Sequence, residues 1–162
     1  MKEYQSWDIL QSYLSEITRQ IALDEFNPDV ILGPGRGGYP IGVMLSHYYN
    51  VPFHGFEWTT RDHGMIKEST RLETILSKYS SDDILIIDDI NDSGETLTAI
   101  DEVVNQFDTD ENNSIFKLHD CIKYATLYDK ESSKFSKVSY AGKIVTPEEE
   151  RWIVFPYEEW WK

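Results

Sequence analysis

The chain has 162 residues, 40% of them hydrophobic and 14% aromatic, which suits one α/β domain over residues 1–162 and leaves too little chain for two. The formal net charge of −14, from 29 acidic against 15 basic residues, would repel polynucleotides and anionic lipid, so we expect neither a nucleic acid nor a membrane as partner. The single cysteine excludes an internal disulfide, and the sequence shows neither a signal peptide nor an apolar run of roughly 20 residues, so we expect a cytoplasmic protein.

The first third of the chain predicts a helix and then a strand followed by a second helix. Apolar residues recur at helical spacing from Leu10 to Ile21, a pattern typical of an amphipathic packing helix. After the break at Asn27-Pro28, Val30–Leu32 begins the first core strand. A helix from Tyr39 to about Tyr49 should follow, with Pro40 in its first turn.

A glycine-rich run, Gly33-Pro34-Gly35-Arg36-Gly37-Gly38, joins that strand to the helix. It satisfies the G-x-G-x-x-G fingerprint of dinucleotide sites, and Glu57 ends the next predicted strand about 20 residues later, as such sites require. Arg36 argues against this interpretation, because a dinucleotide loop presents bare backbone to the pyrophosphate. A dinucleotide-binding oxidoreductase is therefore one alternative, and a plain packing turn is another.

The middle of the chain alternates strands and helices. We expect a strand at Phe53–Trp58, a polar, mobile loop at Thr59–Ser69 and a short helix at Arg71–Tyr79. Further on, the pattern predicts an amphipathic helix at Glu95–Phe107, a solvated linker at Asp108–Ser114 and a strand at Cys121–Tyr128.

The most informative stretch is Ile84–Thr98. Four apolar residues predict a strand buried on both faces that ends at the pair Asp88-Asp89. Adjacent carboxylates repel each other, so we expect a partner for them, such as Mg²⁺ or a sugar diol. The next residues, Asp92–Thr96, offer two hydroxyls, a glycine and the free N–H groups of a starting helix, which suit a phosphate monoester. The alternative is an ordinary helix capped by Asp92 or Ser93.

Residues Ile84–Thr96 resemble the phosphoribosyl pyrophosphate (PRPP) signature of type I phosphoribosyltransferases, in which two acids precede Asp-Thr-Gly-x-Thr. Ser93 replaces the usual threonine and keeps the hydroxyl, while Glu95 occupies a variable position. The resemblance implies the fold of that family: a mostly parallel central sheet flanked by helices, with a small C-terminal hood from about residues 130–162. It implies a PRPP site for the ribose and the 5′-phosphate at Asp88, Asp89, Asp92, Ser93, Gly94, Glu95 and Thr96. Mg²⁺ would bind Asp88 and Asp89, and Asp92 would be the candidate general base.

The Gly35–Gly38 segment resembles the pyrophosphate loop of the same family, often Ser-Arg-Gly-Gly in purine members, with Gly35 in place of the serine. The resemblance implies that Gly35, Arg36, Gly37 and Gly38 bind pyrophosphate, and that the Gly35–Arg36 peptide is cis. The resemblance also implies that the predicted loop at Thr59–Ser69 is a flap over the site. When the flap closes, the pyrophosphate would be approached by Arg61, His63, Lys67 and Arg71. The alternative is that these side chains remain solvated.

The C-terminal part resembles the xanthine–guanine group of purine phosphoribosyltransferases. Lys130, just after the 121–128 strand, would donate to the oxygen at purine C6, Trp152 would stack on the base and Ile153 would offer backbone groups to the C2 edge. The alternative for Trp152 is a core aromatic in an edge strand. Trp160 and Trp161 indicate a subunit contact or a packed terminus.

The sequence therefore predicts an enzyme of purine salvage. It would use Mg²⁺ to transfer ribose 5-phosphate from PRPP to N9 of a 6-oxopurine base, releasing pyrophosphate, and would work as a homo-oligomer, either a dimer or a tetramer. Two alternatives remain at this point: a non-catalytic PRPP-binding sensor, and the oxidoreductase named above.

Overall fold

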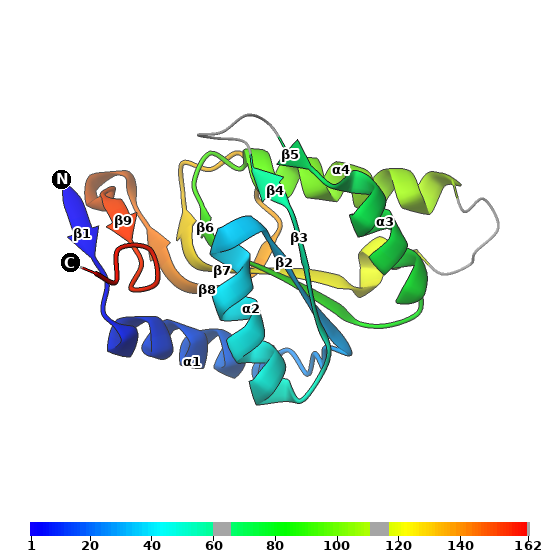
Figure 1. Cartoon of the computed structure of the whole chain (residues 1–162), viewed down its shortest axis with the longest axis horizontal. Coiled ribbons are helices and arrows are strands. Elements are labelled where there is room, and N and C mark those ends of the chain that lie inside the picture. The colour runs from blue at the N-terminus through cyan, green and yellow to red at the C-terminus, as the bar shows by residue number, and fades with distance from the viewer. Residues whose placement is uncertain (60–65, 111–116, 162) are drawn as a thin grey trace.

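A five-stranded parallel sheet forms the centre of the computed structural model, which describes residues 1–59, 66–110 and 117–161 (Figure 1). Its strand order is β3-β2-β6-β7-β8, and every neighbouring pair runs parallel. The strands are β2 (Val30–Pro34), β3 (Phe53–Phe56), β6 (Ile84–Asn91), β7 (Ile122–Lys130) and β8 (Val138–Val145). Parallel strands place their carboxyl ends at one edge, so the segments that follow β2, β6 and β7 meet there.

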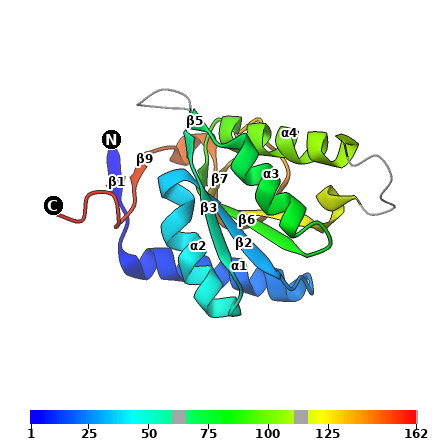
Figure 2. The ribbon, with the colours of Figure 1, turned by 45° about the vertical axis from the view of Figure 1, so that its right-hand side comes forward.

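Helices cover both faces of this sheet. α1 (Trp7–Leu23) and α2 (Gly35–Tyr49) lie on one face, and α3 (Ser69–Lys78) and α4 (Glu95–Asp110) lie on the other (Figures 1 and 2). Because side chains alternate along a strand, Ile84 and Ile86 pack toward α3 and α4, whereas Leu85 and Ile87 pack toward α1 and α2. This arrangement confirms the fold class that the sequence predicted.

The two ends of the chain form a second, two-stranded sheet. β1 (Lys2–Tyr4) runs parallel to β9 (Trp152–Val154), so the labelled N and C termini lie near each other in Figure 1. Lys2 Nζ forms an ion pair with Glu159 at 2.8 Å, and the Tyr4 hydroxyl donates to the same carboxylate at 2.9 Å. The sequence pattern had indicated neither β1 nor β8.

Smaller elements complete the description. β4 (Trp58–Thr59) and β5 (Ile66–Lys67) pair antiparallel, so part of the predicted loop is a two-stranded ribbon. Residues 60–65 of that loop, including Arg61 and His63, lie outside the described residues. Short 3-10 helices occur at Leu118–Cys121 and Pro147–Glu149. None of the helices in the described ranges is long and apolar enough to span a bilayer.

Several predicted boundaries were wrong. β6 continues past the acid pair to Asn91, because Ile90 and Asn91 still pair with β7. α2 begins at Gly35 rather than Tyr39, so the glycine-rich segment is mostly a first helical turn. The predicted solvated linker begins with a buried residue, Asp108, whose carboxylate accepts hydrogen bonds from the N–H groups of Leu118 and His119. Linker residues 111–114 lie outside the described part of the chain.

Candidate active site

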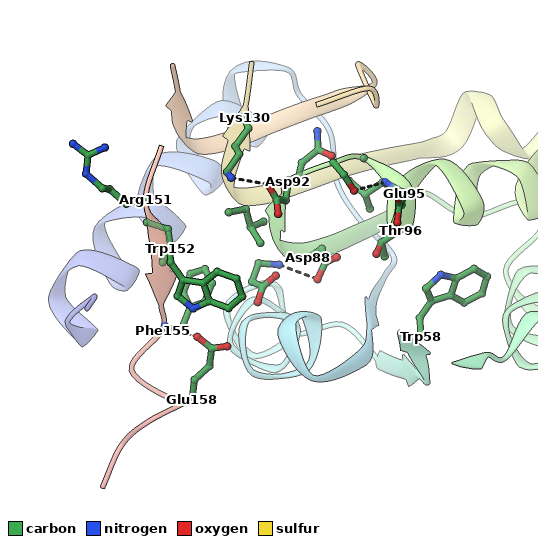
Figure 3. A pocket seen from close by; sticks show the side chains of 17 residues that line it. Trp58, Asp88, Asp92, Glu95, Thr96, Lys130, Arg151, Trp152, Phe155 and Glu158 are labelled. Carbon is green, nitrogen blue, oxygen red and sulfur yellow. Dashed lines mark hydrogen bonds and ion pairs between the residues drawn. The ribbon is translucent and has the colours of Figure 1, made fainter. Parts of the chain in front are cut away.

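The acid pair lies on β6, at the edge of the sheet where the carboxyl ends of the strands meet. Asp88 is only 8% exposed, and its Oδ1 accepts a hydrogen bond of 3.0 Å from the backbone N–H of Asp89 (Figure 3). Burial, and then the neighbouring charge of Asp89, raises the pKa of Asp88 well above its ordinary value. A bound cation or a set of hydroxyl donors at this point would favour the ionised form.

The first turn of α2 packs directly against the acid pair. A Cβ atom on Gly37 would lie 2.5 Å from Cγ of Asp89, so any other residue there would displace the Asp89 side chain. Gly35, Arg36 and Gly37 line a cavity of about 910 Å³ that Asp89 also lines. Gly38 is not part of that wall, and it packs instead against the backbone of β6. The Gly35–Arg36 peptide is trans, so the expectation of a cis bond was wrong.

The predicted phosphate-binding turn follows β6. Gly94 has φ +86°, and a Cβ there would lie 2.5 Å from the backbone nitrogen of Phe135, so conformation and packing both require glycine. The Ser93 hydroxyl accepts a hydrogen bond of 3.4 Å from the N–H of Glu95, which is a capping contact at the start of α4. A helix start of this kind presents backbone N–H groups that suit an anion.

Asn91 stabilises this turn through buried hydrogen bonds, a role that the sequence reasoning missed. Its side chain is 1% exposed and donates to Asp129 Oδ1 at 2.7 Å and to the Phe135 carbonyl at 2.9 Å. It also accepts from the Ser133 hydroxyl at 2.8 Å. The one available signal was an amide shortly after a buried apolar run, where a buried polar group needs partners.

Lys130 and Asp92, the predicted base-binding and general-base residues, contact each other. Lys130 stands at the end of β7, and its Nζ lies 2.6 Å from Oδ1 of Asp92 and 3.8 Å from Oε2 of Glu150 (Figure 3). The lysine side chain is 11% exposed, so the ion pair is largely shielded from water. A hydrogen bond to Asp92 and a longer ion pair with Glu150 therefore hold the ammonium group at the cavity wall.

One cavity of about 270 Å³ joins these groups to the hood. Its wall includes Asp88, Asp89, all of residues 92–96, Lys130, Trp152 and Ile153. Trp152 lies on β9 and is 63% exposed, so it is not a core aromatic, and it lines both cavities. Figure 3 shows Trp152 and Trp58 on opposite sides of Asp88.

Acidic groups outnumber basic ones around both cavities. Within residues 1–59, 66–110 and 117–161, no group of three or more His, Cys, Asp or Glu side chains could hold a metal ion. Mg²⁺ often binds through one or two carboxylates and completes its shell with water and phosphate oxygens. The buried carboxylate of Asp88 and the adjacent Asp89 fit that mode, and they would be its protein ligands.

The architecture is an α/β fold whose parallel sheet brings the acid pair, the 92–96 turn and the first turn of α2 to two neighbouring cavities. The sequence matches the phosphoribosyl transferase domain family over residues 2–160, so the chain belongs to this family. Its members transfer a phosphoribosyl group from PRPP, and this protein is a phosphoribosyltransferase. The dinucleotide-binding alternative is thereby set aside. A comparison with curated proteins finds no significant match.

Solved structures of similar fold include purine phosphoribosyltransferases. The enzyme from Pyrococcus horikoshii OT3 is 25% identical with a TM-score of 0.67, over 98% of this chain and 95% of that one. The xanthine-guanine-hypoxanthine phosphoribosyltransferase of Helicobacter pylori is 20% identical with a TM-score of 0.65, over the same shares. A hypothetical protein from Neisseria gonorrhoeae with bound ppGpp is 18% identical with a TM-score of 0.70, over 98% of this chain and 89% of that one.

Proposed function

We propose that the protein transfers ribose 5-phosphate from PRPP to N9 of a 6-oxopurine, in purine salvage. The observation that supports this substrate class is the position of Lys130 in the same cavity as the acid pair and Trp152. An ammonium group only donates hydrogen bonds, so it suits the oxygen of a 6-oxopurine and does not suit the amino group of adenine. The exposed indole of Trp152 offers a stacking surface for the base.

The role proposed for each residue follows from which of the two cavities it lines. Asp88 and Asp89 would bind the ribose hydroxyls and Mg²⁺, and the 92–96 turn would bind the 5′-phosphate. Arg36 and the first turn of α2 would bind pyrophosphate in the larger cavity. Bound Mg²⁺ would neutralise part of the charge that develops on the departing pyrophosphate.

Asp92 is the proposed general base, and its contact with Lys130 positions the carboxylate for that role. The lysine keeps the Asp92 carboxylate beside the place where the purine would bind, and Asp92 can accept the proton that the base loses. The remaining donors of Lys130 can face the base at the same time, because an ammonium group has three N–H bonds. The two predicted roles are therefore compatible.

A panel of bases tests the proposal. Pyrophosphate release from PRPP and Mg²⁺ should be fast with guanine, xanthine or hypoxanthine and slow with adenine or orotate. Lys130→Met should reduce kcat/KM for the 6-oxopurines about 10-fold to 100-fold, the effect of losing one hydrogen bond from a charged donor. A preference for adenine or for a pyrimidine would contradict the substrate assignment and leave the family assignment unaffected.

A protein with this fold that binds PRPP without turnover would be a regulator, and the same assay would reveal that outcome. Such a protein would bind PRPP and release no pyrophosphate with any base in the panel. The Neisseria gonorrhoeae neighbour holds ppGpp, so ppGpp is the nucleotide to titrate beside PRPP. Tight ppGpp binding together with absent turnover would favour the regulatory role.

A further inference from the structure

Trp58 carries a buried hydrogen-bond donor that has no acceptor. The side chain is 5% exposed, and its indole Nε1 is buried without a hydrogen-bond partner among the residues that the structure describes. An indole N–H donates a hydrogen bond and cannot accept one, so only an acceptor can satisfy it. A buried, unpaired donor costs free energy, and such a group needs an explanation.

The position of this donor points to a ligand. Trp58 begins β4 and lines both cavities, the smaller one with Asp88 and residues 92–96 and the larger one with Arg36. In Figure 3, the edge of the indole that carries the nitrogen is turned toward Thr96. Trp58 and the turn that is proposed to bind phosphate therefore share one cavity wall, with the N–H edge of the ring facing the turn.

Packing fixes the orientation of the ring. Phe56 contacts the indole edge-on, with the ring centroids 5.7 Å apart and an interplanar angle of 89°. The carbonyl oxygen of Trp58 lies against Gly35, where a Cβ atom would come within 2.5 Å of it. Side chain and backbone are both held, so the donor is preorganised and needs little ordering when a ligand binds.

We propose that Trp58 is a substrate-binding residue whose Nε1–H donates to an oxygen of the phosphate held by the Ser93–Thr96 turn. The inference rests on the PRPP site proposed above. A phosphate group suits this donor because each of its oxygens accepts hydrogen bonds and carries part of a negative charge. The bound substrate supplies the acceptor that the free protein lacks.

Binding titrations with two fragments of PRPP test this assignment on the whole protein with Mg²⁺ present. Trp58→Phe keeps an aromatic ring and removes the N–H group. We expect its affinity for ribose 5-phosphate to fall about 10-fold to 100-fold, as for one lost hydrogen bond to a charged acceptor. Its affinity for inorganic pyrophosphate should stay at the wild-type value, because that fragment occupies the Arg36 cavity.

Thermal unfolding of the free protein separates binding from a merely structural role. Trp58→Phe should unfold close to the wild-type Tm, because removing an unpaired donor offsets the loss of ring contacts. Trp160→Phe is the matched control, since that indole is 78% exposed and lines neither cavity. It should bind both fragments as the wild type does.

Four outcomes of these binding measurements are informative. Weaker binding of ribose 5-phosphate alone supports the inference. Unchanged binding of ribose 5-phosphate, with or without a lower Tm, overturns it, and so does an equal loss for both fragments. If the wild type binds neither ribose 5-phosphate nor PRPP, the proposed site itself is wrong, so failure of the site and failure of the Trp58 assignment give different results.

Discussion

Asp88 shows at the scale of one residue how a binding site can reduce the stability of the fold. The carboxyl group is buried beside the charge of Asp89, so the fold favours its protonated form, whereas Mg²⁺ and a sugar diol favour the ionised form. Binding of PRPP with Mg²⁺ should therefore release protons. Strained or destabilised groups at functional sites are a known source of trade-off between stability and activity.

Replacing Asp88 by Asn should raise the Tm and abolish PRPP-dependent turnover. Folding raises the pKa of Asp88 above its ordinary 3.8, so its contribution to stability is complete below that value and is lost as the pH rises through the raised pKa. Asn has no charge to lose, so the gain in Tm over the wild type should grow as the pH rises above 3.8 and through the raised pKa. Melting curves across that range measure it.

Asp89→Asn is the matched control for this prediction. Asp89 is the more exposed of the two carboxylates, so its replacement should also stop turnover and should give a smaller gain in Tm. A gain in Tm for Asp88→Asn that does not change with pH would contradict the assignment of a raised pKa. Retained turnover in either variant would contradict the proposed role of the acid pair.

Sequence reasoning works best at the scale of one residue where a short pattern carries the chemistry. Two acids after an apolar run and a glycine beside hydroxyls predicted an acid pair and a turn in one site, and both line one cavity, although β6 continues past the acids to Asn91. Asn91 and Trp58 were missed because their significance depends on distant partners. Asn91 bonds to a carboxylate 38 positions away, and Trp58 is informative only because an acceptor is missing.

At the scale of elements, the hood depends on a strand from the other end of the chain. β9 carries Trp152, and β1 is its only strand partner within the described residues. The sequence did not predict β1, because three exposed residues show no alternation of apolar and polar side chains. The pairing also joins residues 150 positions apart, such as Lys2 and Trp152, which no local pattern can indicate.

Removing residues 1–5 should loosen β9 and with it the proposed stacking surface. We expect KM for the purine to rise about 5-fold, the equivalent of about 1 kcal/mol of ordering free energy that binding must then supply. KM for PRPP should rise less, because the acid pair lies on β6 and Arg36 on α2, although the deletion also removes Lys2 from the wall of the larger cavity. Steady-state kinetics with each substrate varied in turn measure both constants.

Tyr4→Phe provides the control, since it removes the exposed hydrogen bond to Glu159, lines neither cavity and keeps the backbone pairing of β1 with β9. A single exposed hydrogen bond contributes little, so this variant should retain the wild-type KM values. Equal increases in both KM values on deletion of residues 1–5 would show that β1 supports the whole site rather than the hood.

At the scale of the whole molecule, two features of the surface have opposite effects on self-association. The net charge of −14 keeps copies of the chain apart at low ionic strength. Trp160 and Trp161 are 78% and 65% exposed, so the predicted packed terminus is wrong, and the proposal that remains is a contact between subunits. Burying two indoles between copies would offset part of the charge repulsion.

Self-association should therefore increase with salt. Added salt screens the repulsion between like-charged copies and leaves the apolar contact largely intact, so the fraction of dimer or tetramer in sedimentation velocity should rise as NaCl increases. The double variant Trp160→Ser, Trp161→Ser should sediment as a monomer at every salt concentration. A wild type that stays monomeric at high salt would contradict this proposal.

The pairing of β1 with β9 also has a practical consequence for anyone who produces this protein. Both ends of the polypeptide lie beside the hood, and the larger cavity includes Lys2, Glu159 and Trp161 in its wall. An affinity tag or a fluorescent fusion at either terminus would sit at the mouth of that cavity. Activity should be measured after proteolytic removal of any such appendage, because an attached tag can block entry and mimic an inactive enzyme.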